Sequence, residues 1–132
     1  MDERHKASHA TILLIEDEDI TAAMLTFLLE RLGYATVRLN DGREACAHID
    51  HHDPPALVIS DVMLPYRNGL HVLSHIRNHP KWSQVPVIML TSDSSEHDIQ
   101  QALDSGANDY VVKPFNPREL TARLQRFLKH VA

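Results

Sequence analysis

Four short runs of apolar residues constrain the fold of this chain more than any other feature of its sequence, because each run is continuous rather than alternating. The runs are Ile12–Ile15, Leu57–Ile59, Val85–Leu90 and Tyr110–Val112. Strands that are covered on both faces, as in a parallel sheet, have this pattern. A fifth run, Ala35–Leu39, is weaker because Arg38 interrupts it, which favours a strand at the edge of the sheet.

Apolar residues between the runs recur at three- and four-residue spacing, as on the buried face of a helix. In the first of these segments they are Ile20, Ala23, Met24, Phe27, Leu28 and Leu32, and Gly33 follows as a helix stop. Further helices are predicted around residues 70–76, 99–103 and 120–131, with a shorter one over Gly42–His51.

This alternation of strand and helix, repeated five times, predicts an α/β fold. We expect a five-stranded parallel sheet that is doubly wound, with helices on both faces. The flavodoxin-like strand order 2-1-3-4-5 is the working hypothesis, because it places a reversal of strand order between the first and third strands.

The size and composition of the chain favour one globular domain. Its 132 residues are 43% hydrophobic and 23% charged, which is ordinary for a globular protein. We expect residues 1–10 to form a flexible tail and residues 11–132 to form the domain, with no space for a separate output module. Cys46 is the single cysteine, so an internal disulfide is excluded.

The charge and hydropathy of the chain argue against two classes of partner. The net charge of −5 disfavours direct contact with nucleic acid, which selects basic surfaces. No apolar run approaches the roughly 20 residues that a membrane helix needs, and the polar N-terminus lacks the apolar stretch of a signal peptide. We therefore expect a cytoplasmic protein that meets neither nucleic acid nor membrane.

Polar residues follow the apolar runs at the points where the strands are expected to end. They are Glu16 and Asp17 after Ile12–Ile15, Asp61 after Leu57–Ile59, Thr91 after Val85–Leu90 and Lys113 after Tyr110–Val112. Ligands of open parallel sheets bind beyond the carboxyl ends of the strands, where the strand order reverses. The three carboxylates would then share one crevice, with the hydroxyl and the ammonium at its rim.

The chemistry of such a crevice is that of phosphoryl transfer. Three close carboxylates repel one another unless a cation intervenes, and their oxygens suit Mg²⁺. One carboxylate could attack phosphorus and form an acyl phosphate, while the lysine and the hydroxyl hold the phosphoryl oxygens.

Five stretches of the sequence, taken in order, resemble the response-regulator receiver domain of two-component signalling, the CheY-like family. They are Ile12–Glu18, Ile59–Pro65, Asn68–Leu70, Val87–Ser92 and Gly106–Phe115. The resemblance spans nearly the whole chain, from about residue 10 to residue 131. It implies a signalling switch rather than a metabolic enzyme.

The resemblance also implies a role for each site residue. Asp61 would accept a phosphoryl group from a histidine kinase or a histidine phosphotransfer protein and would slowly lose it again by hydrolysis. Mg²⁺ would be held by Glu16, Asp17, Asp61 and the backbone carbonyl of Met63. Lys113 would pair with the phosphoryl group and Thr91 would donate a hydrogen bond to it.

Switching is implied in the same way. Tyr110 would swing inward as Thr91 moves, and a downstream protein would read the face made by the fourth helix, fifth strand and fifth helix, about residues 96–130. The bond between Lys113 and Pro114 is expected to be cis.

Other interpretations of these residues remain open at this stage. Asp17 or Asp19 could cap the first helix. The string from Asp17 to Thr21 also fits the Asp-x-Asp-x-Thr motif of haloacid-dehalogenase phosphatases, with Asp17 as nucleophile and Asp19 as acid. A scaffold with a receiver fold that is never phosphorylated is a third possibility.

Histidines form the remaining conspicuous pattern. His48, His51 and His52 cluster, and His71 and His75 are four residues apart. Zinc proteases need a glutamate directly after the first histidine of such a pair, and Val72 stands there instead. We expect these histidines to lie on solvated helix faces.

Overall fold

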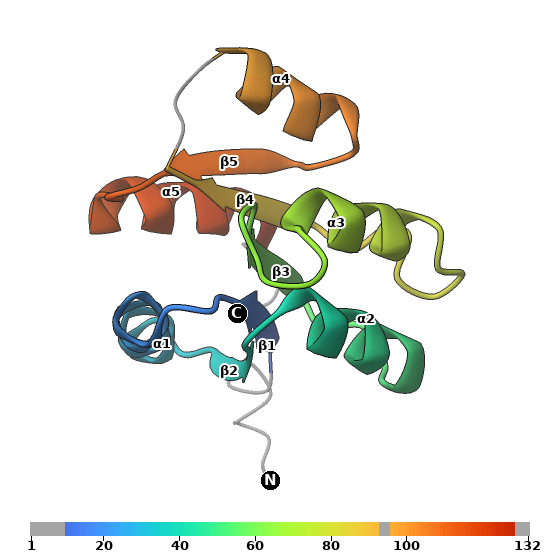
Figure 1. Cartoon of the computed structure of the whole chain (residues 1–132). Coiled ribbons are helices and arrows are strands. Elements are labelled where there is room, and N and C mark those ends of the chain that lie inside the picture. The colour runs from blue at the N-terminus through green and yellow to red at the C-terminus, as the bar shows by residue number, and fades with distance from the viewer. Residues whose placement is uncertain (1–9, 93–95, 129–132) are drawn as a thin grey trace, which may run out of the picture.

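The computed structural model describes residues 10–92 and 96–128, which form one parallel sheet flanked by helices (Figure 1). Its strands are β1 (Thr11–Ile15), β2 (Ala35–Leu39), β3 (Leu57–Asp61), β4 (Val87–Thr91) and β5 (Asp109–Val112). Its helices are α1 (Asp19–Arg31), α2 (Gly42–His51), α3 (Gly69–Arg77), α4 (Glu96–Asp104) and α5 (Pro117–Leu128). The strand order is β2-β1-β3-β4-β5, all parallel, so the predicted fold class and strand order are confirmed.

Successive residues of the central strands face opposite sides of the sheet, and each side carries its own core. Leu13 and Ile15 of β1 pack with buried residues of α2, α3 and α4. Ile12 and Leu14 pack with buried residues of α1 and α5. Figure 1 shows α1 and α5 on one side of the sheet and α2 and α3 on the other. Continuous apolar runs in the sequence follow from this coverage of both faces.

The buried face of α1 differs from the predicted one. Its buried residues are Ala22, Leu25 and Leu29, whereas Ile20, Met24 and Phe27 are 71%, 56% and 63% exposed. Apolar residues occur almost all the way round this helix, so their spacing fits more than one stripe. The connection from β1 and the position of α5 select the stripe that meets the sheet.

The two edge strands are β2 and β5. The edge position predicted for β2 is confirmed. The coverage on both faces predicted for Tyr110–Val112 is wrong, because β5 alternates buried residues with half-buried ones. Tyr110 and Val112 are the half-buried residues, so the face of β5 that carries them is covered less than the face that carries Val111.

Some predictions fall outside the described residues. They are the flexible tail, apart from Ala10, and the end of the last helix, including Val131. Among the residues that the structure describes, no helix combines the length and the apolar character that crossing a bilayer requires.

Candidate functional site

Three carboxylates converge at the carboxyl ends of β1 and β3. Glu16, Asp17 and Asp61 each contribute an oxygen atom, and these oxygens all lie within 4.8 Å of one another. Glu16 is fully buried, Asp61 is 6% exposed and Asp17 is exposed. The sheet order therefore brings together the acidic residues that the strand ends predicted, and Asp17 is the member of the cluster that solvent reaches.

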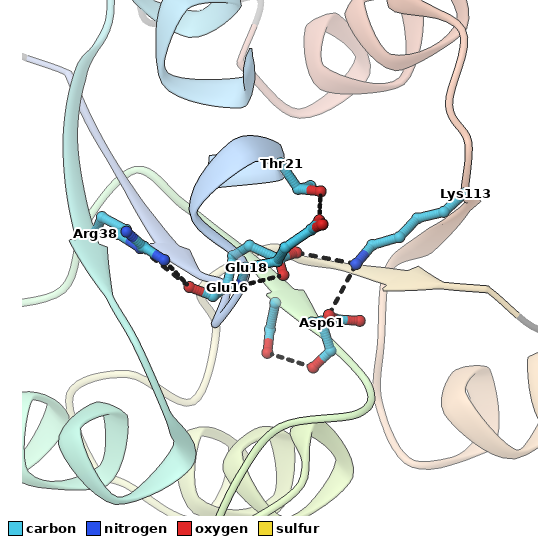
Figure 2. A network of polar contacts seen from close by, with 7 residues as sticks. Glu16, Glu18, Thr21, Arg38, Asp61 and Lys113 are labelled. Carbon is cyan, nitrogen blue, oxygen red and sulfur yellow. Dashed lines mark hydrogen bonds and ion pairs between the residues drawn. The ribbon is translucent and has the colours of Figure 1, made fainter. Parts of the chain in front are cut away.

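The ammonium of Lys113 lies between two of these carboxylates (Figure 2). Its Nζ is 2.8 Å from Oδ2 of Asp61 and 3.0 Å from Oε1 of Glu16. Lys113 follows β5, and its backbone N–H donates to the carbonyl of Thr91 at 2.7 Å. The bond between Lys113 and Pro114 is cis, as expected from the resemblance.

Burial and charge act in opposite directions on these groups. Burial raises the pKa of Glu16, although hydrogen bonds from the Glu18 N–H and from Lys113 offset part of that rise. Burial alone would lower the pKa of Lys113, but the hydrogen bonds and charges of Asp61 and Glu16 outweigh it and raise that pKa. Lys113 is therefore a cation at neutral pH and acts as the counter-ion of the acidic cluster.

The loop from β1 to α1 is fixed by side chains rather than by a helix cap from aspartate. Glu18 is the N-cap residue of α1 and makes no side-chain cap bond. Its backbone N–H instead donates to Oε2 of Glu16 at 3.1 Å, and its carboxylate accepts a hydrogen bond from Thr21. Asp19 is the first residue of the helix. The suggestion that Asp17 or Asp19 caps α1 is therefore wrong.

Thr91, Tyr110 and Met63 line one hollow beside α4, next to the acidic cluster. Thr91 is the buried last residue of β4, whereas Met63 is 73% exposed. Tyr110 is half-buried on β5, and its ring lies 5.4 Å from the guanidinium of Arg123 on α5. The predicted switch residues, Thr91 and Tyr110, thus line the same hollow. The coupled movement of the two side chains stays a prediction.

Two contacts at the site had no clear signal in the sequence. Gly69, the first residue of α3, packs so closely that an added Cβ would lie 2.1 Å from the carbonyl oxygen of Asp61. Arg38 on β2 reaches over the end of β1 and binds the carbonyl oxygen of Glu16. The sequence marked Arg38 merely as an interruption of a strand.

The histidines do not form a comparable site. His48 stacks on His52 with ring centroids 3.9 Å apart, and His75 contacts Asp50 at 2.8 Å. Within residues 10–92 and 96–128, the cluster of Glu16, Asp17 and Asp61 is the sole group of three potential ligands that converges within 4.8 Å. Cys46, the single cysteine of the chain, is buried and forms no disulfide.

Comparison with known proteins identifies the family. Residues 12–125 match the family model described as response regulator receiver domain. The chain belongs to that family. The CheY-like resemblance is thereby confirmed, and with it the interpretation as a signalling domain of two-component systems.

Two transcriptional regulatory proteins each match 89% of this chain. PhoP of Bacillus subtilis (strain 168), the alkaline phosphatase synthesis transcriptional regulatory protein, is 37% identical over 118 residues, which are 89% of this chain and 48% of PhoP. The transcriptional regulatory protein CpxR of Klebsiella pneumoniae is 41% identical over 118 residues, which are 89% of this chain and 49% of CpxR. The chain thus spans about half the length of these curated relatives.

Solved structures agree with this assignment. The receiver domain of sensor histidine kinase PA1611 from Pseudomonas aeruginosa PAO1 has a TM-score of 0.83 and 30% identity, and the match covers 92% of this chain and 98% of that one. That structure has a magnesium ion coordinated in its active-site cleft. Chemotaxis response regulator CheY4 of Vibrio cholerae has a TM-score of 0.84 and 32% identity, with coverage of 91% and 99%.

The phosphatase interpretation finds no support in this receiver domain. Asp19, its supposed acid, lies outside the carboxylate cluster, with Oδ1 held by Arg38 at 2.9 Å and a side chain that is 91% exposed. The hydroxyl of Thr21, the last residue of the phosphatase motif, is engaged by Glu18. Asp17 alone of that motif lies in the cluster.

Proposed function

We propose that Asp61 is the phosphoacceptor of this receiver domain and takes its phosphoryl group from a phosphohistidine of a histidine kinase or a histidine phosphotransfer protein. The observation that carries the proposal is the position of Asp61, which lies in the acidic cluster while Lys113 holds its Oδ2 at 2.8 Å. A carboxylate held beside an ammonium can take up a phosphoryl group whose charge that ammonium then balances.

The reaction is a transfer between two nucleophiles. An oxygen of the Asp61 carboxylate attacks phosphorus and forms an acyl phosphate, and the phosphorus–nitrogen bond of the donor breaks. The electron pair of that bond returns to the imidazole nitrogen, which takes up a proton from solvent. Water later attacks the phosphorus, which releases inorganic phosphate and restores the carboxylate. This slow cycle is that of a switch rather than of a metabolic enzyme.

Mg²⁺ fits the donor set of the site. Three carboxylates within 4.8 Å, one of them fully buried, carry more negative charge than Lys113 alone balances. We propose that Glu16, Asp17, Asp61 and the backbone carbonyl of Met63 hold the ion, because oxygen ligands of this kind suit it. The bound ion would supply charge neutralisation for the incoming phosphoryl group. Lys113 would keep its proton and hold the phosphoryl oxygens by charge and hydrogen bonds.

The output would be a change at the face built from α4, β5 and α5, about residues 96–130, of which the structure describes residues 96–128. Thr91 would donate a hydrogen bond to the new phosphoryl group, and Tyr110 would follow it into the hollow that both residues line. A downstream protein that prefers one of the two arrangements would shift their populations. We propose a protein partner for this face, rather than nucleic acid or a membrane.

We also propose that residues 11–132 make up the receiver domain after a tail at residues 1–10. Membership of the receiver family supports a further proposal, that the protein acts in the cytoplasm.

Intact mass spectrometry after incubation with acetyl phosphate and Mg²⁺ tests the proposal. Wild type should gain about 80 Da, the mass of one covalent phosphoryl group. Asp61→Asn and Asp17→Asn should not gain it. Asp109→Asn is a matched control, because Asp109 is also a buried carboxylate that pairs with a cation, Arg123, yet it lies at the opposite end of the sheet. This control should gain the full mass.

Each alternative has its own outcome. An adduct that is lost in Asp17→Asn but kept in Asp61→Asn would make Asp17 the nucleophile and overturn the proposal. A wild type that takes up no phosphoryl group either from acetyl phosphate or from phosphorylated histidine phosphotransfer proteins would overturn the proposal. The remaining interpretation would then be a scaffold with a receiver fold that is never phosphorylated.

A further inference from the structure

The side chain of Arg38 donates three hydrogen bonds to the segment from Glu16 to Asp19. Its Nε and Nη2 donate to the carbonyl oxygen of Glu16 at 3.0 and 2.9 Å, and its Nη1 donates to Oδ1 of Asp19 at 2.9 Å. Figure 2 shows the guanidinium against the backbone of Glu16, on the side away from Lys113. Arg38 stands on the edge strand β2, level with Leu14 of β1.

We infer that Arg38 is a positioning residue for the proposed Mg²⁺ site: it fixes the peptide unit between Glu16 and Asp17 so that both carboxylates face Asp61. The inference rests on the proposed function for the identity of the ion. It concerns a residue that touches neither the ion nor the phosphoryl group.

The main chain of Glu16 links Arg38 to Asp17. A peptide unit is planar, so the carbonyl direction of Glu16 sets the direction of the Asp17 N–H and the position of the Asp17 Cα. The N–H of Glu16 donates to the carbonyl of Leu39 at 3.0 Å, while the carbonyl of Glu16 accepts from Arg38. Two consecutive residues of β2 therefore hold both main-chain polar groups of Glu16.

The side chains of the cluster differ in how they are held. Glu16 is fixed by Lys113 and by the N–H of Glu18, and Asp61 is fixed by Lys113. Asp17 is exposed, and among the described residues none donates a hydrogen bond to its carboxylate. Its place in the cluster is therefore set by its backbone, which is where Arg38 acts.

The charge of Arg38 cannot be the reason for its place. A cation beside the cluster opposes the binding of another cation, so charge alone would weaken the affinity for Mg²⁺. The bond to Asp19 adds little, because that carboxylate is almost fully exposed. What remains is the pair of hydrogen bonds that Nε and Nη2 donate to the Glu16 carbonyl, which holds the loop in place. Arginine can make this forked contact because its guanidinium carries two N–H groups side by side, and lysine cannot.

The substitution Arg38→Lys separates these effects, because it keeps the charge and removes the fork. We would titrate the full chain with Mg²⁺ by calorimetry, without phosphodonor. If Arg38 positions the loop, the dissociation constant should rise by roughly tenfold, the effect of losing about one hydrogen bond from a charged donor. If Arg38 acted through charge alone, Arg38→Lys would bind as wild type does and Arg38→Met would bind more tightly. Either of those results would overturn the inference.

Arg77→Lys is the matched control. Arg77 also donates to backbone carbonyls, those of Gly106, Ser83 and Val85, but from the end of α3. The control should lose stability and keep the Mg²⁺ affinity of wild type. An equal loss of affinity in Arg77→Lys would show that general destabilisation is responsible and would overturn the inference.

Hydrogen exchange gives a readout that does not depend on the ion. Without Mg²⁺, the amides of Asp17 and Glu18 should exchange faster in Arg38→Lys than in wild type, and at the wild-type rate in Arg77→Lys. Unchanged exchange in Arg38→Lys would contradict the inference. Asp17→Asn, which should weaken Mg²⁺ binding, confirms that the titrated site is the acidic cluster.

The two proposals can fail separately. A wild type that binds Mg²⁺ but gains no phosphoryl group would overturn the proposed function and leave the role of Arg38 standing. A wild type that is phosphorylated while Arg38→Lys binds Mg²⁺ normally would overturn the role of Arg38 alone.

Discussion

Nζ of Lys113 lies 2.8 Å from Oδ2 of Asp61, although 52 positions separate the two residues in the chain. Parallel pairing of β3 with β4 and of β4 with β5 makes this contact, because it aligns the carboxyl ends of the three strands. The same ammonium also holds the buried carboxylate of Glu16. One lysine therefore pairs with two carboxylates of the cluster, and it stands where a phosphoryl group on Asp61 would need a counter-ion.

Substitution of Lys113 by Met should destabilise the protein and make its stability depend on Mg²⁺. Two buried carboxylates lose their counter-ion, which we expect to lower the free energy of unfolding by about 1.5–3 kcal/mol, the range for hydrogen bonds to charged groups. Mg²⁺ should then raise the denaturation midpoint more in Lys113→Met than in wild type, because binding to the folded state stabilises it. Urea unfolding with and without Mg²⁺ measures both effects.

The pH and the control for this experiment follow from the structure. The pKa of Lys113 is raised above its ordinary value of 10.5, so its stabilising contribution is complete below that value and is lost as pH rises through the folded pKa. Neutral pH is therefore suitable. Lys81→Met removes a lysine that is 70% exposed and 3.7 Å from Asp53, and it should change neither stability nor its response to Mg²⁺. A Lys113→Met protein as stable as this control would contradict the counter-ion role.

Substitution of Gly69 by Ala should disturb Asp61 through its backbone. The new Cβ would lie 2.1 Å from the Asp61 carbonyl oxygen, so β3 or α3 must shift. We expect a loss of stability together with a slower gain of phosphoryl mass from acetyl phosphate. Gly33→Ala is the control: Gly33 has a φ of +99° and open space around it, so the variant is strained at a site remote from the cluster. It should lose about 1 kcal/mol of stability and be phosphorylated at the wild-type rate. Equal rates in the two variants would argue against the contact.

The face of α1 that meets the sheet gives a stability prediction. Leu25 is fully buried, so Leu25→Ala should cost about 2–5 kcal/mol. Phe27 is 63% exposed, so Phe27→Ala should stay within about 0.5 kcal/mol of wild type despite the larger side chain removed. Chemical denaturation of the two variants measures the difference. A larger loss of stability in Phe27→Ala than in Leu25→Ala would show that the apolar face predicted from the spacing is the one that meets the sheet.

The limits of prediction from the sequence are visible at α1 and at Arg38. Strand ends and their polar residues could be predicted, because continuous apolar runs mark buried strands and parallel pairing then aligns their ends. Glu16, Asp17, Asp61 and Lys113 meet for that reason alone. The buried face of α1 could not be predicted, because the helix is apolar nearly all round and tertiary packing decides its rotation.

Side chain to backbone contacts were the second limit. Arg38 reaches a carbonyl 22 residues away, and Gly69 is needed because a neighbouring backbone passes close by. Neither contact leaves a periodic pattern in the sequence. Both depend on the relative placement of strands and loops, which appears only once the sheet is assembled.

The stability of the protein should fall on mild acidification because of His48. Its ring stacks on His52 at 3.9 Å and meets Trp82 edge-on at 6.2 Å. Burial, and then the charge of His52, lower the pKa of His48 below its ordinary value of 6.5. The unfolded chain therefore binds a proton at this residue more readily than the folded protein does, so stability is lost as pH falls through 6.5 towards the folded pKa.

Urea unfolding followed by far-ultraviolet circular dichroism, between about pH 7.5 and about pH 5.5, covers the range in which histidine titrates. His48→Gln should lose less stability than wild type across this interval, because glutamine cannot take up the proton. His52→Gln should show a smaller change in the same direction, since burial is the larger cause of the shift at His48. The contact of Asp50 with His75 is common to wild type and to both variants, so it cancels in the comparison. A His48→Gln protein whose stability falls as steeply as that of wild type would show that another group carries the acid sensitivity.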